Sequence, residues 1–121
     1  MTYDTDNIFA KILRGEIPCI KVFENDHALA LEDINPMAPV HVLVIPKGEY
    51  ISMVDFSSAA SDIEIADFNR AVGEVAKIKG LIETGYRTLA NHGINARQDV
   101  FHYHVHVVGG RDLGEMIKKE S

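Results

Sequence analysis

The sequence predicts an α+β domain in which helices pack on an antiparallel sheet. Two patterns carry this prediction: five short apolar runs bounded by turn residues, and one long stretch in which apolar residues recur every three or four positions. Short turns between the runs are typical of antiparallel strands. The length of 121 residues suits one compact unit, so we expect residues 1–121 to form a single domain. The expected strands cover residues 20–24, 28–32, 40–45, 86–91 and 99–108.

Two helices are expected, one short and one long. The short helix starts after Asn7, whose side chain can cap a helix N-terminus, and runs through Arg14 to a stop at Gly15. The long helix is expected over residues 57–79, with Gly80 ending it. Its expected buried stripe consists of Ile65, Phe68, Val72, Val75 and Ile78.

The composition is that of an acidic globular protein. Lys and Arg number 12 and Asp and Glu 18, which gives a formal net charge of −6. Nucleic acids and anionic membranes attract basic surfaces, so we expect neither as a partner, while local donors still allow a small anionic ligand. Cys19 is the only cysteine, which excludes an intramolecular disulfide and a zinc site built from cysteines. The N-terminus does not resemble a secretory signal and no apolar stretch approaches the ~20 residues of a membrane helix, so we expect a cytoplasmic protein.

Three of the six histidines lie within five residues. Alternate side chains of a strand share a face, so His102, His104 and His106 are expected to point to one side. The residues between them are apolar or aromatic and would point toward the long helix. A polar face on a strand does not need histidine, because Thr, Ser or Lys would serve as well. The pattern therefore indicates a functional role.

Two chemistries use imidazoles in this arrangement. Histidines two positions apart on a strand can bind zinc together with a third nitrogen from elsewhere. Alternatively, one histidine acts as a nucleophile while its neighbours bind anionic oxygens and shuttle protons. The strand offers no obvious carboxylate to support metal ligands, whereas Asn91, Arg97 and Gln98 lie just upstream as candidate phosphate donors. The pattern favours the nucleophile, with the zinc site as the alternative.

The histidine run and several further segments resemble the histidine triad (HIT) superfamily. The sequence HYHVHVV at 102–108 matches its signature of three histidines alternating with hydrophobic residues. The resemblance covers nearly the whole chain and is to the Hint branch of nucleotide-binding proteins, particularly the bacterial type. The segments that carry it are IFAKI at 8–12, GEIP at 15–18, DINP at 33–36, VHVLVIPK at 40–47 and GGRDLG at 109–114.

The resemblance implies a HIT-like fold, in which the five-stranded sheets of two protomers join into the ten-stranded sheet of a homodimer. It implies binding of purine nucleoside monophosphates such as AMP, and hydrolysis of nucleoside 5′-phosphoramidates. By this resemblance His104 attacks the phosphorus and forms a nucleotidyl-histidine that water hydrolyses, and His106 helps the leaving group depart. His102 and His41 support them through hydrogen bonds, and the scheme requires no metal or other cofactor.

The same resemblance implies a nucleotide pocket. Asp33 would accept hydrogen bonds from the ribose hydroxyls, although it also fits a turn before Pro36. Asn91 and Gln98 would donate to phosphate oxygens, unless they cap loop backbone. Asp99 stands where many Hint members have serine, and its carboxylate would repel a phosphate unless protonated or turned aside. The slot for the base would be formed by Phe9, Ile12, Ile17 and Ile34.

Two other functions stay open within this resemblance. One is a dinucleoside polyphosphate hydrolase of the Fhit type, and the other is a nucleotide-binding regulatory protein with weak catalysis. The sequence GGR at 109–111 and the short C-terminal tail favour the Hint type over the Fhit type.

Overall fold

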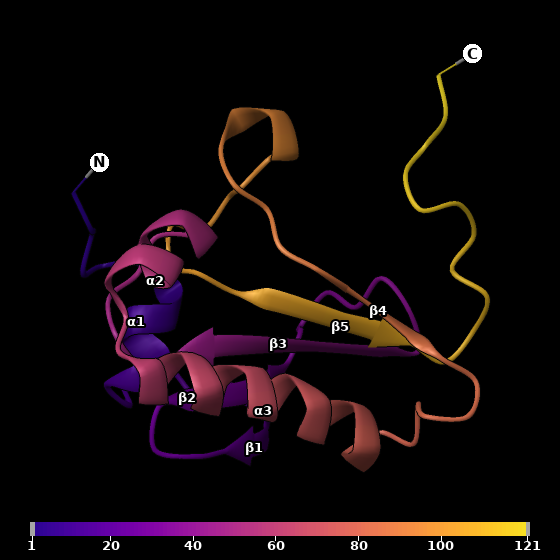
Figure 1. Ribbon diagram of the computed structural model, residues 1–121, viewed down its shortest axis with the longest axis horizontal. Helices are drawn as coiled ribbons and strands as arrows, with labels where there is room; N and C mark the ends of the chain where they lie inside the picture. The colour runs from indigo at the N-terminus through magenta and orange to yellow at the C-terminus, as the bar shows by residue number, and fades with distance from the viewer. Residues whose placement is uncertain (1, 121) are drawn as a thin grey trace.

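The computed structural model describes residues 2–120 and confirms the α+β fold class (Figure 1). Five strands form one antiparallel sheet in the order β1-β2-β3-β5-β4. The strands are β1 (Lys21–Glu24), β2 (Ala28–Glu32), β3 (Val40–Pro46), β4 (Tyr86–Leu89) and β5 (Val105–Gly109).

The last strand is shorter than the sequence predicted. β5 begins at Val105, so the expected strand from residue 99 was wrong over its first six residues. Its partner β3 ends at Pro46, which has no backbone N–H to extend the ladder. The N–H of Tyr103 instead donates to the carbonyl of Tyr50, 2.7 Å away. Residues 99–104 therefore approach the sheet as an irregular segment.

The long helix of the prediction is two helices. They are α2 (Met53–Ala59) and α3 (Asp62–Ile78), separated by Ala60 in an extended conformation and Ser61. The Ser61 side chain caps α3 and forms a capping box with Glu64, which gives α3 a start of its own.

The buried stripe of α3 is also narrower than predicted. Phe68 and Val75 are buried, together with Ala71 and Ala76. Ile65 is 37% exposed and Ile78 is 52% exposed, because both lie toward the ends of the helix. The prediction that these two isoleucines are buried was wrong.

The short helix agrees with the prediction. It is α1 (Ile8–Leu13), and the Asn7 side chain accepts a hydrogen bond from the N–H of Ala10 at 2.9 Å. A single 3₁₀ turn, η1 (Ile94–Ala96), lies in the loop that projects between β4 and β5 in Figure 1. No helix within residues 2–120 is long and apolar enough to span a membrane.

The two faces of the sheet have different coverings. α3 lies across one face (Figure 1). There Tyr103, Val105 and Val107 pack with Phe68 and Val75, as the sequence indicated. On the other face, Phe9 of α1 packs on the β2–β3 part of the sheet, against Leu29, Leu31, Leu43 and Ile45. The histidines lie on this second face.

Candidate active site

Four histidines meet on the face of the sheet opposite α3. His41 lies on β3 and His106 on the neighbouring strand β5, in a register that pairs residue 43 with His106. His102 and His104 lie just before β5, and the Phe9 ring makes edge contacts with both of their rings. His102 is fully buried, His41 and His104 are each 5% exposed, and His106 is half-buried.

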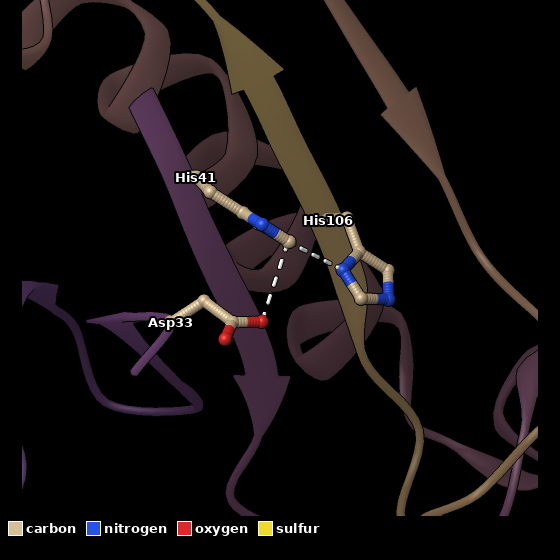
Figure 2. A group of neighbouring side chains, drawn as sticks. All are labelled: Asp33, His41 and His106. Carbon is tan, nitrogen blue, oxygen red and sulfur yellow. Dashed lines mark hydrogen bonds and ion pairs between the residues drawn. The ribbon is translucent and has the colours of Figure 1, made fainter. Parts of the chain in front are cut away.

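His41 and His106 form a hydrogen-bonded chain that defines their tautomers (Figure 2). The backbone N–H of Met37 donates to His41 Nδ1 at 3.0 Å, so this nitrogen carries a lone pair. The hydrogen of neutral His41 is then on Nε2, which lies 2.9 Å from His106 Nδ1 and 3.3 Å from Asp33 Oδ2. His106 accepts at Nδ1 and therefore carries its own hydrogen on Nε2.

The His106 ring is neutral at pH 7 in the free protein. Burial lowers the pKa of His106 to about 4, and charge on His104 or His41 would lower it further. The carboxylates of Asp33 and Asp99 act in the opposite direction and raise the pKa. A bound anion would add to the effect of these carboxylates.

His104 has one hydrogen-bonded nitrogen and one open nitrogen. Its Nδ1 lies 2.7 Å from the carbonyl oxygen of His102, and a carbonyl only accepts, so Nδ1 carries the hydrogen. In the neutral ring Nε2 then holds the lone pair. Within the described part of the chain every fully buried side-chain nitrogen has a partner, and Nε2 has none, so it opens onto the pocket that His104 lines. A neutral imidazole with such a lone pair can accept a proton or attack an electrophile.

His102 has both ring nitrogens engaged. Nε2 lies 2.8 Å from the carbonyl oxygen of Pro46 and must donate to it, while Nδ1 lies 2.6 Å from the Tyr3 hydroxyl. Burial lowers the pKa of His102 to about 4, so the ring is neutral. No local sequence pattern points to Tyr3, because it lies 99 positions from His102.

A pocket opens between α1 and the histidines, and we call it the apolar pocket. It brings together the four residues predicted for the base slot with Asp33, Asp99, His104 and His106. Asp33 Oδ1 accepts the N–H of Asn35 at 2.8 Å, so the predicted turn is present. Its carboxylate still faces the pocket. Ile34 is 83% exposed at this site.

A second pocket lies on the other side of His106, and we call it the β4-side pocket. Asn91 lines it together with His41, His106, Arg87 and Arg111. The two arginines bind backbone carbonyls: Arg111 donates to Met37 and Arg87 to Gly114. His106 is thus the residue on which the two pockets meet.

The side chain of Gln98 is hydrogen-bonded to backbone groups and lines neither the apolar pocket nor the β4-side pocket. Its amide nitrogen donates to the carbonyls of Ile51 and Val100, at 2.7 and 3.2 Å, and its oxygen accepts the N–H of Gly93 at 3.1 Å. Both amide hydrogens are therefore donated to backbone carbonyls, one in the loop of Gln98 itself and one in the segment before α2. These bonds match the alternative in which Gln98 caps loop backbone, and they tie the loop after β4 to the segment before α2.

The side chains fit a metal ion poorly. His102 offers no free nitrogen to a metal, because both of its ring nitrogens are bonded. A different set, Asp33, His41 and His106, offers three ligand atoms within 4.8 Å of one another. For His41 to bind a metal through Nε2, its hydrogen would have to move to Nδ1, where it would face the N–H of Met37. The tautomer that the Met37 N–H favours therefore suits the hydrogen bond and ion pair drawn in Figure 2 and not a metal at His41.

These features define a class of protein that presents an imidazole with one unbonded ring nitrogen to a small-ligand pocket. The chain belongs to the HIT domain family, whose sequence pattern matches residues 14–113, which confirms the resemblance found in the sequence. An uncharacterized HIT-like protein of Azospirillum brasilense is 61% identical over 98% of this chain and 97% of its own length. A purine nucleoside phosphoramidase of Escherichia coli is 38% identical over 93% of each chain. A HIT family hydrolase of Clostridium thermocellum has a similar structure, with a TM-score of 0.82 and 37% identity over 93% of this chain and 97% of its own.

Proposed function

We propose that this protein hydrolyses purine nucleoside 5′-phosphoramidates through a nucleotidyl-histidine intermediate on His104. The observation that carries the proposal is a pair of neighbouring imidazoles, one with an acceptor and the other with a donor at its open Nε2. His104 presents a lone pair at Nε2, and His106 presents a hydrogen at Nε2, with their ring centroids 5.1 Å apart. The named activity of the Escherichia coli relative supports the choice of substrate.

The first half of the reaction transfers the nucleotidyl group to His104. The anionic phosphate raises the pKa of His106, which takes up a proton before the chemical step. The hydrogen on His41 Nε2 then has Asp33 Oδ2, 3.3 Å away, as its acceptor. His104 Nε2 attacks phosphorus, the P–N bond breaks, and the leaving nitrogen keeps the electron pair and takes the Nε2 proton of His106.

The second half releases the nucleotide. Neutral His106 accepts a proton from water as the water oxygen attacks phosphorus, and the bond between phosphorus and His104 Nε2 breaks. The products are the nucleoside monophosphate and free His104, and His106 is protonated again. The carbonyl of His102 holds His104 Nδ1–H through both halves and favours the positive charge on the nucleotidyl-histidine.

The two pockets match the two parts of the substrate. In the apolar pocket the base would cover Ile34, which is otherwise exposed, and the ribose hydroxyls would donate to Asp33. Each oxygen of Asp33 has two lone pairs, so its bond to Asn35 leaves room for a ribose hydroxyl. The leaving amine would depart into the β4-side pocket, beside Asn91.

Steady-state and quench experiments with adenosine 5′-phosphoramidate test this proposal. We expect turnover to AMP and ammonia without added metal, and we expect acid-labile, base-stable adenylyl label on the protein in rapidly quenched reactions. The comparison substrate is diadenosine polyphosphate, for which we expect slower turnover. Faster hydrolysis of the dinucleotide would support a Fhit-type hydrolase, and AMP binding without turnover of either compound would support a regulatory protein.

We also propose that the protein is a homodimer with a continuous ten-stranded sheet. β4 pairs with β5 alone among the described strands, so its outer edge is free to pair with a second copy. Beside this edge lies a groove lined by Met53, Ile65 and Leu89, whose exposed fractions are 58%, 37% and 39%. A second copy would bury these apolar side chains.

Sedimentation at micromolar concentration is expected to show a species of about twice the 13.4 kDa chain mass. The variant Ile65→Glu is expected to sediment as the monomer, because it puts a charge into the groove. The matched control is Ile78→Glu, on the same helix but outside the groove, and it should remain dimeric. A wild-type protein that sediments as a monomer would overturn the dimer proposal.

A further inference from the structure

The N-terminal segment before α1 has a direct contact with the histidine cluster. The hydroxyl of Tyr3 lies 2.6 Å from His102 Nδ1, and the two rings meet edge to face with centroids 5.7 Å apart. The segment follows a defined path, because Asn7 donates to the carbonyl of Asp4 and Arg14 donates to the carbonyl of Thr5, each at 2.7 Å. Tyr3 is therefore held against His102 by several bonds along the segment.

The Tyr3 hydroxyl completes the hydrogen bonding of a fully buried ring. The carbonyl of Pro46 requires the hydrogen of His102 to be on Nε2, which leaves a lone pair on Nδ1. Tyr3 is the group that donates to this lone pair. Without the hydroxyl, a buried acceptor would lose its partner, and the other tautomer or a rotated ring would become competitive.

The position of the His102 ring is coupled to the nucleophile through the backbone. His102 and His104 lie in the irregular segment before β5, where the bond from the Tyr103 N–H to the Tyr50 carbonyl holds the chain in place of a strand ladder. The carbonyl of His102 is the group that binds His104 Nδ1–H at 2.7 Å. A ring held from two sides, by Tyr3 and by Pro46, therefore keeps this carbonyl in place.

We propose that Tyr3 is a positioning residue for His104, acting through the ring and carbonyl of His102. The proposal rests on the proposed function, in which His104 Nε2 must lie in line with the phosphorus. Tyr3 does not line the apolar pocket, so its effect is on the chemical step and not on nucleotide binding.

The test is the variant Tyr3→Phe, which removes only the hydroxyl. We expect the single-turnover rate for adenosine 5′-phosphoramidate to fall about tenfold, the size of effect that one lost hydrogen bond to a buried group produces. The affinity for AMP and the KM should change by less than about twofold. The matched control is Tyr50→Phe, which removes a hydroxyl that donates to Glu64 of α3 at 2.8 Å. Its rate should equal that of the wild type.

Nitrogen-15 NMR of the imidazoles provides a second measurement that does not depend on turnover. In Tyr3→Phe we expect the Nδ1 resonance of His102 to move toward that of an unbonded lone pair, and the resonances of His104 to shift with it. In Tyr50→Phe both should stay in place. Unchanged His102 and His104 resonances in Tyr3→Phe would overturn the proposal even if the wild type had no activity.

The rate measurement separates this inference from the proposed function. A wild-type protein without phosphoramidate turnover would overturn the proposed function. Normal turnover by the wild type together with an unchanged rate in Tyr3→Phe would overturn the role of Tyr3 alone. An equal loss of rate in Tyr3→Phe and Tyr50→Phe would also overturn it, because the effect would then reflect general stability.

Discussion

His104→Ala is expected to lower the turnover of adenosine 5′-phosphoramidate by about 10⁴-fold or more, because it removes the nitrogen that forms the covalent bond to phosphorus. The affinity for AMP should remain, since the base slot and Asp33 are formed by other elements. The measurements are single-turnover kinetics, detection of adenylyl label on the protein, and calorimetric titration with AMP. No label should appear on the variant.

The matched control for this variant is His92→Ala. His92 is exposed and lines neither the apolar pocket nor the β4-side pocket. Its ring is hydrogen-bonded to the hydroxyl of Ser52, which caps α2. Its removal should leave turnover unchanged. If His104→Ala retained wild-type turnover or still carried adenylyl label, the covalent role of His104 would be refuted.

His106→Gln is expected to have an effect that depends on the leaving group. Glutamine is polar and of similar size but cannot give a proton, so departure of an alkylamine should slow by about 10²- to 10⁴-fold. A p-nitrophenyl ester of AMP leaves as a stable phenolate and needs no proton, so its turnover should fall by less than about tenfold. The measurement is kcat for the two substrates with the wild type and with the variant.

The two substrates serve as controls for each other, because they share the nucleotide and differ only in the leaving group. An equal loss of kcat for both would show that His106 positions the phosphate and donates no proton. A loss confined to the amine substrate is the expected result. Binding of AMP should persist in the variant, since the apolar pocket keeps its other lining residues.

Local patterns in the sequence predicted much of the fold but misjudged where elements begin and end. The apolar spacing over residues 57–79 favoured one helix, yet serines at 52 and 61 each cap a separate helix with an acidic partner three residues later. The second of these capping boxes was a readable signal that the apolar periodicity obscured. At β5 the limiting residue is Pro46, whose effect appears only when the strands are paired.

The two candidate phosphate donors also show that local sequence does not determine how a side chain is used. Asn91 and Gln98 looked equivalent in the sequence, since both are amides close to the histidines. In the structure Asn91 reaches the β4-side pocket, whereas Gln98 bonds to two backbone groups of its own loop and to the carbonyl of Ile51 before α2. An amide side chain serves either use equally well, so only the path of the loop decided between them.

The sequence by itself predicted which side chains face together, because alternation depends only on neighbouring residues, and the grouping holds although β5 begins only at Val105. It was sufficient to place His102, His104 and His106 opposite the side chains that pack on α3, and with other segments it indicated the HIT family. The tertiary structure decided which ring nitrogen carries the hydrogen in His102, in His41 and, through His41, in His106. That choice depends on the Pro46 carbonyl, the Met37 N–H and the Tyr3 hydroxyl. These groups lie at other points along the chain, so no local pattern specifies them, and packing alone brings them within hydrogen-bond distance of the imidazoles.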